Sequence, residues 1–195
     1  MFEALQQADT QCFRWINSHN STALDWIMWT LSQHWSWAVV LVIAFLALTV
    51  RTFHLSPFTF HIEKRWWMVA TAVALCFLLA DQGSVLIKES VERLRPCHAL
   101  EDVHMFRTHC GGPYGFVSSH AANAFAVVTF LILCYRKRPW AVVLLTLWAV
   151  ATCYSRVYLG KHYPGDVVGG IVLGVAVGLV VYWVCKFFFK KVAFP

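Results

Sequence analysis

The chain has 195 residues, of which 59% are hydrophobic and only 13% are charged. Soluble domains are about half apolar and about one quarter charged, so this composition excludes an ordinary soluble domain and indicates a membrane protein. The net charge of +6 does not indicate a nucleic-acid partner, because the basic runs are short and lie beside apolar segments, as in positive-inside topology.

Residues 1–34 form the first of two expected parts of the chain, an amphipathic N-terminal segment. Apolar side chains such as Phe2, Phe13 and Trp15 alternate there with polar ones, and the segment lacks the roughly 20 apolar residues that a spanning helix needs. Trp-rich segments of this kind are typical of helices in the membrane interface. A buried or re-entrant first helix is the alternative. No cleavable signal peptide is expected, because the start of the chain has no apolar core.

Residues 35–195 form the second part, for which we expect an all-α integral membrane bundle with five to six transmembrane helices. Each expected span is a mainly apolar run bounded by basic or polar residues. The clearest spans are Trp35–Val50, Trp66–Leu86, Ser119–Tyr135, Pro139–Ser155 and Gly165–Phe189.

Basic residues indicate how these spans are oriented. They fill positions 136–138 and 190–191, which are separated by two spans and therefore lie on one side of the membrane. The positive-inside rule assigns that side to the cytoplasm. The loops over 88–118 and 156–164 then share the outer face, which in a bacterial inner membrane faces the periplasm.

Gly170, Gly174 and Gly178 recur every four residues in the last expected span. Residues four apart lie on the same side of a helix. Small residues at this spacing let two helices approach closely, so they predict a packing face and not a binding site.

The outer end of the second span carries charged residues at heptad spacing. Asp81, Lys88 and Arg95 are each seven residues apart, so on a continuing helix they emerge from one face. We expect Asp81 to hold Lys88, and Pro96 to break the helix at Arg95. The alternative is a solvated helix end with ion pairs four residues apart, Lys88 with Glu92 and Glu89 with Arg93.

Ser118, Ser119 and His120 open the third span. A serine at a helix start caps the helix, and the free amides of the first turn form an anion site. His120 can donate or accept a proton at the mouth of the bundle, and Asn123, one turn further on, is expected to orient it. A purely structural histidine is the alternative.

Arg156, His162 and Asp166 lie close together between the last two spans. A guanidinium can bind a phosphate through two parallel hydrogen bonds. His162 is a nucleophile if a carboxylate holds its far ring nitrogen, and Asp166 follows four residues later, in the first turn of a helix opened by Pro164. Alternatively, Arg156 ends one helix and Asp166 complements the dipole of the next.

Together these residues resemble the three signature motifs of the type-2 phosphatidic acid phosphatase superfamily, integral-membrane lipid phosphatases related to bacterial acid phosphatases and vanadium haloperoxidases. The motifs occur in the family's order, as Lys-x6-Arg-Pro at 88–96, Ser-Ser-His at 118–120 and Ser-Arg-x5-His-x3-Asp at 155–166. The resemblance covers about Trp66 to Gly178 and leaves out residues 1–34. The middle motif departs from the family's usual Pro-Ser-Gly-His, because Val117 replaces Pro and Ser119 replaces Gly.

The resemblance implies a hydrolase that acts through a phosphohistidine. It implies that His162 is the nucleophile, that Asp166 fixes its tautomer, and that His120 protonates the leaving oxygen. Because several cationic and hydroxyl donors can neutralise a phosphate together, no metal or other cofactor is expected. The phosphoryl oxygens would be held by Lys88, Arg95, Ser118, Ser119 and Arg156.

The cysteines fall into an outer and a spanning group. Cys97 and Cys110 bracket the outer loop, where an oxidising compartment would permit a disulfide. It would close a loop of about 14 residues, worth on the order of 3 kcal/mol. Cys12 lies in the amphipathic segment, and four others are expected to be small apolar fillers of the spans, namely Cys76, Cys134, Cys153 and Cys185.

The leading hypothesis is a lipid phosphatase at the outer leaflet, with a lipid phosphate as substrate and neither nucleic acid nor an obligate protein partner. Undecaprenyl diphosphate is preferred, because the chain is short and its site faces the compartment in which that carrier is released. Phosphatidylglycerophosphate, phosphatidate and lipid A 1-phosphate are alternatives. Headgroup selectivity is expected in the loop 97–117, with Arg107, His98, His104 and His109. Two other classes are retained: a vanadate-binding oxidase and a non-enzymatic lipid-binding or lipid-moving bundle.

Overall fold

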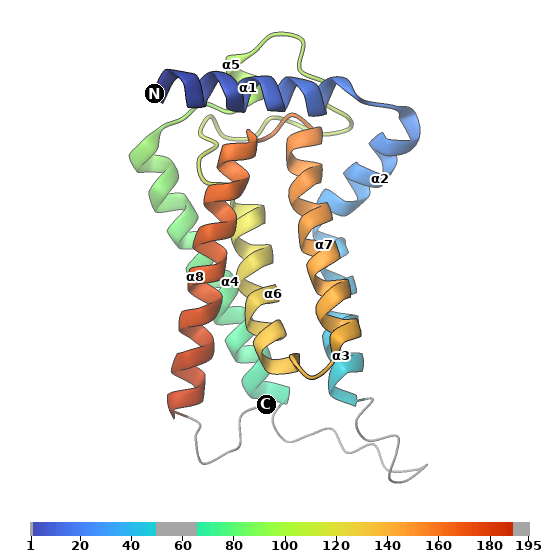
Figure 1. The fold of residues 1–195 in the computed structure, drawn as a ribbon, viewed down its shortest axis with the longest axis vertical. Coiled ribbons are helices and arrows are strands. Elements are labelled where there is room, and N and C mark those ends of the chain that lie inside the picture. Colours follow the sequence, from blue (N-terminus) through green and yellow to red (C-terminus); the bar gives the residue numbers. More distant parts are fainter. Residues whose placement is uncertain (1, 50–65, 189–195) are drawn as a thin grey trace.

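The computed structural model describes residues 2–49 and 66–188, and helices dominate both ranges (Figure 1). The described residues contain no β-strand, only an isolated bridge between Leu94 and Tyr114. The expected all-α fold is therefore confirmed. The helices are α1 Phe2–Ser18, α2 Thr22–Ser32, the 3₁₀ helix η1 His34–Ser36, α3 Trp37–Thr49, α4 Trp66–Val91, α5 Pro96–Ala99, α6 Ser119–Tyr135, α7 Pro139–Tyr158 and α8 Pro164–Phe188.

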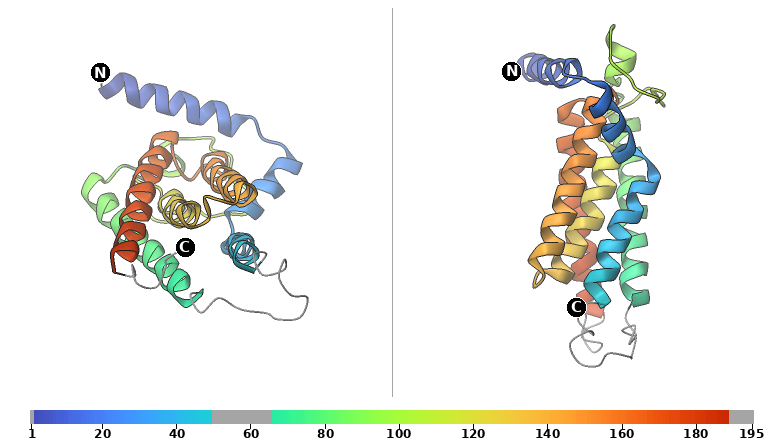
Figure 2. Two further views of the ribbon diagram at one scale, coloured as in Figure 1. Left: turned by 60° about the horizontal axis from the view of Figure 1, so that its bottom comes forward. Right: turned by 90° about the vertical axis from the view of Figure 1, so that its right-hand side faces the viewer.

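The long helices form a bundle around α6 (Figures 1 and 2). α6 packs against α4, α7 and α8, while α2 and α3 pack against α7. The side chains of α6 are apolar on most sides and largely buried, among them Ala122, Val127, Phe130 and Leu131. A helix that is apolar all round needs neighbours on every side, which explains its central position.

The segments expected to span the membrane are helical over their described residues. α4, α7 and α8 are each long and apolar enough to cross a membrane. α2 and α3 meet the same requirement as one bent pair, with an angle of 63° between them. α6 has 17 residues, or roughly 26 Å at 1.5 Å per residue, which is short for a span. In Figure 1 it begins below the upper ends of α7 and α8, so its N-terminus lies within the bundle.

The predicted glycine face of α8 packs against α6. A Cβ atom at Gly170 would lie 2.5 Å from the carbonyl oxygen of Ser118, and one at Gly174 would overlap the carbonyl oxygen of Ala122. Gly178 meets the next turn of α6 in the same way. The two backbones are therefore in direct contact, which brings the start of α8 next to the start of α6.

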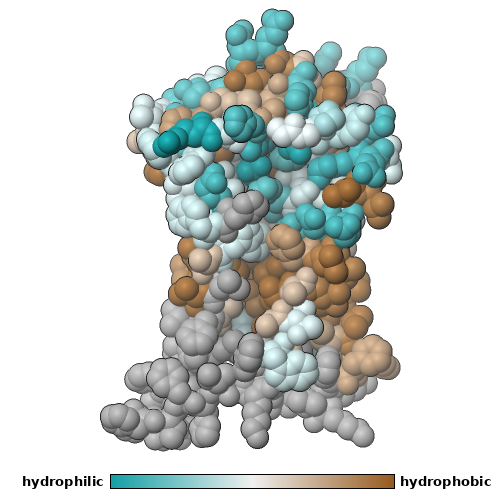
Figure 3. All heavy atoms as spheres, turned by 180° about the vertical axis from the view of Figure 1, so that it is seen from behind, coloured by the Kyte–Doolittle hydropathy of each residue, from teal (hydrophilic) through white to brown (hydrophobic). Residues whose placement is uncertain are grey.

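α1 lies across one end of the bundle rather than along it (Figures 1 and 2). Phe13 and Asn17 are buried on its inner side, whereas Leu5 and Trp15 are each 64% exposed. Hydrophilic residues gather at this end of the molecule, and hydrophobic residues cover the bundle below it (Figure 3). The interfacial position expected for residues 1–34 stays a prediction, and this orientation supports it.

Polar contacts tie the N-terminal helices to the outer loop and to α7. The side-chain amide of Asn17 donates to the carbonyl oxygens of His104 and Tyr158, at 3.0 and 2.7 Å. The buried carboxylate of Asp25 accepts from the Tyr158 hydroxyl at 2.8 Å. These bonds fix α1 and α2 over the end of α7.

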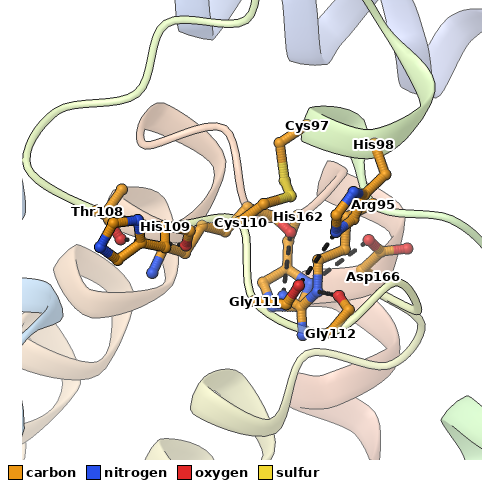
Figure 4. Close-up of a disulfide and its surroundings, with 11 residues drawn as sticks. Arg95, Cys97, His98, Thr108, His109, Cys110, Gly111, Gly112, His162 and Asp166 are labelled. Carbon is orange, nitrogen blue, oxygen red and sulfur yellow. Dashed lines mark hydrogen bonds and ion pairs between the residues drawn. A yellow bond between two sulfur atoms is a disulfide. The ribbon is translucent and has the colours of Figure 1, made fainter.

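Cys97 is bonded to Cys110, with their Cα atoms 5.9 Å apart (Figure 4). The disulfide closes the outer loop beside Arg95, which follows α4. The four cysteines expected in the spans are buried, and Cys12 on α1 is exposed.

Candidate active site

His162 lies in the short connection between α7 and α8 and is 2% exposed. Its Nε2 accepts a hydrogen bond from Arg95 at 3.0 Å, and its Nδ1 lies 3.5 Å from Oδ2 of Asp166 (Figure 4). Nε2 therefore carries the lone pair and Nδ1 the proton. Burial, together with the positive charges of Arg95 and Arg156, lowers the pKa of His162 well below its usual range. The neutral imidazole is the form that can attack an electrophile.

Asp166 lies in the first turn of α8 and is completely buried. Its Oδ1 accepts from the Arg93 guanidinium at 2.8 Å, and its Oδ2 accepts from the backbone amide of Tyr163 at 3.0 Å. The carbonyl oxygen of Asp166 accepts from the amide of Ser118 at 2.9 Å. The residue thus joins two sequence motifs, because its backbone holds the start of α6 while its carboxylate faces His162.

The expected helix through Arg95 is not formed, because α4 ends at Val91. Glu92 has a φ of 52°, in the left-handed region, and turns the chain away from the helix axis. Arg95 follows in extended backbone, with φ −67° and ψ 155°. Heptad spacing therefore does not bring Arg95 to the site.

The outer loop aims the Arg95 side chain instead. Nε donates to the carbonyl oxygen of Gly112 at 2.8 Å, and one terminal nitrogen donates to that of Lys161 at 3.3 Å. Gly112 follows Cys110 closely, so the disulfide and this hydrogen bond hold the same stretch (Figure 4). The loop and the α7–α8 connection together point the guanidinium at His162.

Ser118 and Arg156 each carry a buried donor atom without a hydrogen-bond partner among the described residues. Ser118 is the N-cap of α6, but its hydroxyl makes neither the expected capping bond nor any other hydrogen bond. Arg156 is 4% exposed, and its Nε has no hydrogen-bond partner. An unpaired buried polar group costs about 1–3 kcal/mol, so such groups are normally paired. Both groups can donate a hydrogen bond to a bound anion.

Lys88 reaches the N-terminus of α6, where Ser118, Ser119 and His120 lie. Its ammonium donates to the hydroxyls of Ser119 and of Ser84, the latter at 3.3 Å. The two hydroxyls lie 2.7 Å apart. His120 occupies the first turn of α6 beside them and is partly exposed. Residues of the first two motifs are thus in contact, although they come from different helices.

Asp81 and Asn123 contact each other. The carboxylate of Asp81 accepts from the side-chain amide of Asn123 at 3.3 Å, and its negative charge also acts on Lys88. The roles expected for the two residues, holding Lys88 and orienting His120, stay predictions. The two residues bind each other across α4 and α6, a long-range pairing that local spacing does not reveal.

Arg93 is the main residue that sequence reasoning missed. Its spacing predicts only a surface ion pair with Glu89, but its guanidinium binds Asp166 at 2.8 Å and Asp9 of α1 at 2.6 Å. The guanidinium also lies over the ring of Tyr163, 4.2 Å from its centroid. No local signal could have found these partners, since the two aspartates lie 84 and 73 positions away in the sequence.

Lys161 is a second missed cation, and its position next to His162 was the available signal. Burial, with the positive charges of Arg156 and Arg95, lowers the pKa of Lys161 to about 8. Burial also lowers the pKa of Arg95. Cations that repel one another in a half-buried site favour an anionic ligand. Within 2–49 and 66–188, no group of His, Cys, Asp and Glu side chains could hold a metal ion.

Basic residues of the loop 97–117 mainly hold the loop in place. His104 binds the carboxylate of Asp25 at 2.7 Å, and Nε2 of His98 lies 3.1 Å from the carbonyl oxygen of Gly111. Arg107 lies over the ring of Trp26, 4.8 Å from its centroid. These contacts give the residues structural roles, and their expected part in headgroup selectivity stays a prediction.

A family model and known proteins match this chain. The model of the PAP2 superfamily matches residues 65–190, which contain helices α4 to α8 and all three motifs. A lipid A 4′-phosphatase of Bacteroides thetaiotaomicron is 34% identical over 193 residues, which cover 94% of this chain and 80% of that protein. The undecaprenyl-diphosphatase BcrC of Bacillus subtilis is 30% identical over 80 residues, 41% of this chain and 39% of that protein.

A solved structure shows the same fold. The PAP2-type phosphatidylglycerolphosphate phosphatase of Bacillus subtilis superposes with a TM-score of 0.67. The superposition covers 97% of this chain and 88% of that protein, with 21% sequence identity. The N-terminal helices and the bundle therefore both have counterparts in a transmembrane protein.

Proposed function

Because this chain belongs to the PAP2 superfamily and is a membrane lipid phosphatase, we propose that it hydrolyses a phosphomonoester on a lipid A-type glycolipid. The extent of the likeness to the lipid A 4′-phosphatase carries this proposal. A match over 94% of the chain reaches beyond the family region at 65–190 into the N-terminal helices, whose Asp9 contacts the site. We place the site at the outer face of the membrane, as the positions of the basic residues suggest.

The proposed reaction begins with attack by His162 on phosphorus. Nε2 forms a bond to phosphorus while the bond from phosphorus to the lipid oxygen breaks, and the departing oxygen takes a proton from His120. Arg95 releases Nε2 and turns its hydrogen bond to a phosphoryl oxygen. Asp166 keeps the proton on Nδ1 and stabilises the positive charge of the phosphohistidine.

The phosphoryl oxygens are proposed to lie among the donors that surround Nε2. Nε of Arg156 and the hydroxyl of Ser118 are buried there without hydrogen-bond partners, and the amides that open α6 add partial positive charge. Lys88 and Ser119 complete the set from the side of α4. Donors aimed at developing negative charge stabilise the transition state more than the ground state, which is how such a cradle accelerates transfer.

Hydrolysis of the phosphohistidine completes the cycle. His120, which lost its proton in the first step, takes one from a water molecule. The water oxygen bonds to phosphorus, the bond from phosphorus to Nε2 breaks, and inorganic phosphate leaves. The net reaction consumes one water and returns both histidines to their starting forms.

Undecaprenyl diphosphate is the second candidate substrate, because the undecaprenyl-diphosphatase BcrC is 30% identical to this chain over 80 residues. The same cradle would bind its terminal phosphoryl group, and the leaving group would be a phosphate oxygen rather than a sugar oxygen. Its likeness covers less than half of this chain, so we rank it below a lipid A-type substrate.

The test measures phosphate release by the purified full-length protein in detergent with EDTA. The substrates are lipid A phosphorylated at positions 1 and 4′, undecaprenyl diphosphate, phosphatidate and phosphatidylglycerophosphate. We expect release of one phosphate from lipid A, from the position that mass spectrometry identifies, at a rate above that for the other lipids. His162→Ala should lower this rate by about 1,000-fold or more.

The matched control is His19→Ala, which replaces an exposed histidine at the end of the N-terminal helix. It should leave the rate unchanged. Faster release from undecaprenyl diphosphate would support the second candidate. Release from no lipid, or equal rates for the wild type and His162→Ala, would contradict a histidine phosphatase and favour a lipid-binding or lipid-moving bundle.

A further inference from the structure

The N-terminal helix reaches the proposed catalytic carboxylate through one arginine. Arg93 donates from one terminal nitrogen to Oδ1 of Asp166 at 2.8 Å and from the other to Oδ2 of Asp9 at 2.6 Å. Asp9 belongs to α1, outside the region that the family model matches. The guanidinium is thus a bridge between two carboxylates, one in α1 and one beside His162.

Asp9 makes a second contact with the same catalytic turn. Its Oδ1 accepts from the backbone amide of Gly165 at 2.7 Å, one residue before Asp166. A Cβ atom at Gly165 would lie 2.8 Å from Oδ2 of Asp9, so only glycine leaves room for this approach. One turn along α1, the ring of Phe13 packs edge-on against Tyr163 at 5.5 Å between centroids. α1 is therefore attached to residues 163–166 at two points.

These contacts restrain the orientation of the Asp166 carboxylate. Oδ1 is held by Arg93 and Oδ2 by the amide of Tyr163, which leaves Oδ2 facing Nδ1 of His162 at 3.5 Å. Arg93 is itself restrained, because it lies over the ring of Tyr163 and its carbonyl oxygen accepts from the amide of Gly115 at 2.8 Å. Because the planar guanidinium of Arg93 is held on both sides, the carboxylate of Asp166 has little freedom to rotate.

The charges of the three residues do not cancel. Arg93 alone would neutralise Asp166, and a neutralised carboxylate would stabilise a positive charge on His162 poorly. Asp9 shares the same guanidinium, so Asp9, Arg93 and Asp166 together carry one net negative charge. That charge lies beside the imidazole on which positive charge develops during phosphoryl transfer.

We propose that Asp9 and Arg93 are positioning residues of the phosphatase, through which α1 orients Asp166 and preserves its negative charge toward His162. The inference rests on the proposed roles of His162 and Asp166. Neither residue reaches the phosphate, so their effect falls on the chemical step and not on binding of the phosphoryl group. α1 is then a part of the catalytic apparatus and not only a membrane contact.

The experiment compares Asp9→Asn and Arg93→Lys in the full-length protein with bis-phosphorylated lipid A, and with dioctanoyl phosphatidate as a second substrate. Asparagine keeps an oxygen that accepts from the Gly165 amide but removes the negative charge of Asp9. Lysine keeps the positive charge of Arg93 but lacks the two planar nitrogens that bind the two carboxylates. We expect kcat to fall about 10- to 100-fold in each variant, with KM changed by less than about twofold. Inhibition by orthovanadate, a phosphate mimic bound by the cradle, should be unchanged.

Glu3→Gln is the matched control, because it makes the same change at an exposed carboxylate of α1 that does not contact the site. Two results would overturn the inference. In one, both variants keep kcat within about twofold of Glu3→Gln while His162→Ala is inactive, which leaves the proposed function standing. In the other, kcat falls only together with vanadate affinity and melting temperature, as expected if the site simply unfolds. Activity in His162→Ala would instead contradict the proposed function itself.

Discussion

At the scale of single residues, the site holds more positive charge than its carboxylates can neutralise. Arg95, Arg156 and Lys88 all act on His162, and together with burial they lower its pKa well below the usual range. A lowered histidine pKa keeps the ring neutral in moderately acidic solution, since protons must be more concentrated to charge it. The cations that we propose bind the phosphate thus also oppose protonation of His162, the proposed nucleophile.

This charge arrangement predicts the pH dependence of the reaction. We expect the acid limb of kcat/KM to lie at lower pH in the wild type than in Arg95→Gln, because loss of a cation raises the pKa of His162. Arg95→Lys keeps the charge and should keep the wild-type limb. The pH profiles of all three proteins are measured with the same lipid phosphate, so ionisation of the substrate affects them equally. An acid limb at the same pH in Arg95→Gln and in the wild type would contradict the prediction.

Sequence reasoning identified candidates for direct chemical roles more readily than the residues that contact them. His162 and Asp166 are four residues apart, and Lys88, Arg95 and Arg156 lie in recognisable motifs, so short-range patterns were enough. Supporting contacts join distant parts of the chain, as in Asp81 with Asn123, 42 positions apart. Spacing rules describe one helix, so they relate Asp81 to Lys88 one heptad away but cannot relate it to Asn123 on α6.

At the scale of elements, the contact between α6 and α8 determines the geometry of the site. The start of each helix carries one half of the chemistry, with Ser118 and His120 in one and Asp166 in the other. Glycines on α8 let the backbones touch, and the amide of Ser118 donates to the carbonyl oxygen of Asp166 at 2.9 Å. The four-residue glycine pattern predicted a packing face correctly, but its partner helix could be identified only from the structure.

Replacing one of these glycines should separate the two helices. A Cβ atom in Gly174→Ala would overlap the carbonyl oxygen of Ala122, and such overpacking costs about 1–3 kcal/mol. We expect the melting temperature in detergent to fall by several degrees and activity to fall with it. Gly83→Ala is the control, since its Cβ would lie 3.7 Å from Leu173, an ordinary contact. Equal melting temperatures for the two variants would contradict direct backbone contact.

At the scale of the whole molecule, the chain places its chemistry at one end of an apolar bundle. α1 and the outer loop cover this end, while the turn between α6 and α7, with residues 136–138, lies at the other (Figure 1). The positions of the apolar helices followed from hydropathy alone, although α4 and α7 continue to Val91 and Tyr158, past their expected ends at Leu86 and Ser155. The crosswise course of α1 did not, because an amphipathic pattern shows which side of a helix is buried but not what it packs against.

The topology can be tested with a native cysteine. Cys12 is exposed on α1, whereas the other free cysteines in the described ranges are buried. A membrane-impermeant maleimide should therefore label the protein in intact spheroplasts, and Cys12→Ser should abolish the labelling. Lys137→Cys, placed in the Cys12→Ser background, should react only after the membrane is permeabilised. Labelling of Lys137→Cys in intact spheroplasts would reverse the proposed orientation.

The contact between Asp9 and Gly165 joins two residues that the ribosome produces at very different times. They are 156 positions apart, so at 5–20 residues per second a ribosome takes roughly 8–30 s to produce the second after the first. Until then the helix that carries Asp9 has no partner turn, and Asp166 has not been made. With the proposed roles of Asp9 and Asp166, a prematurely terminated chain would insert several helices into the membrane yet hydrolyse nothing, and activity would begin only once α8 is made.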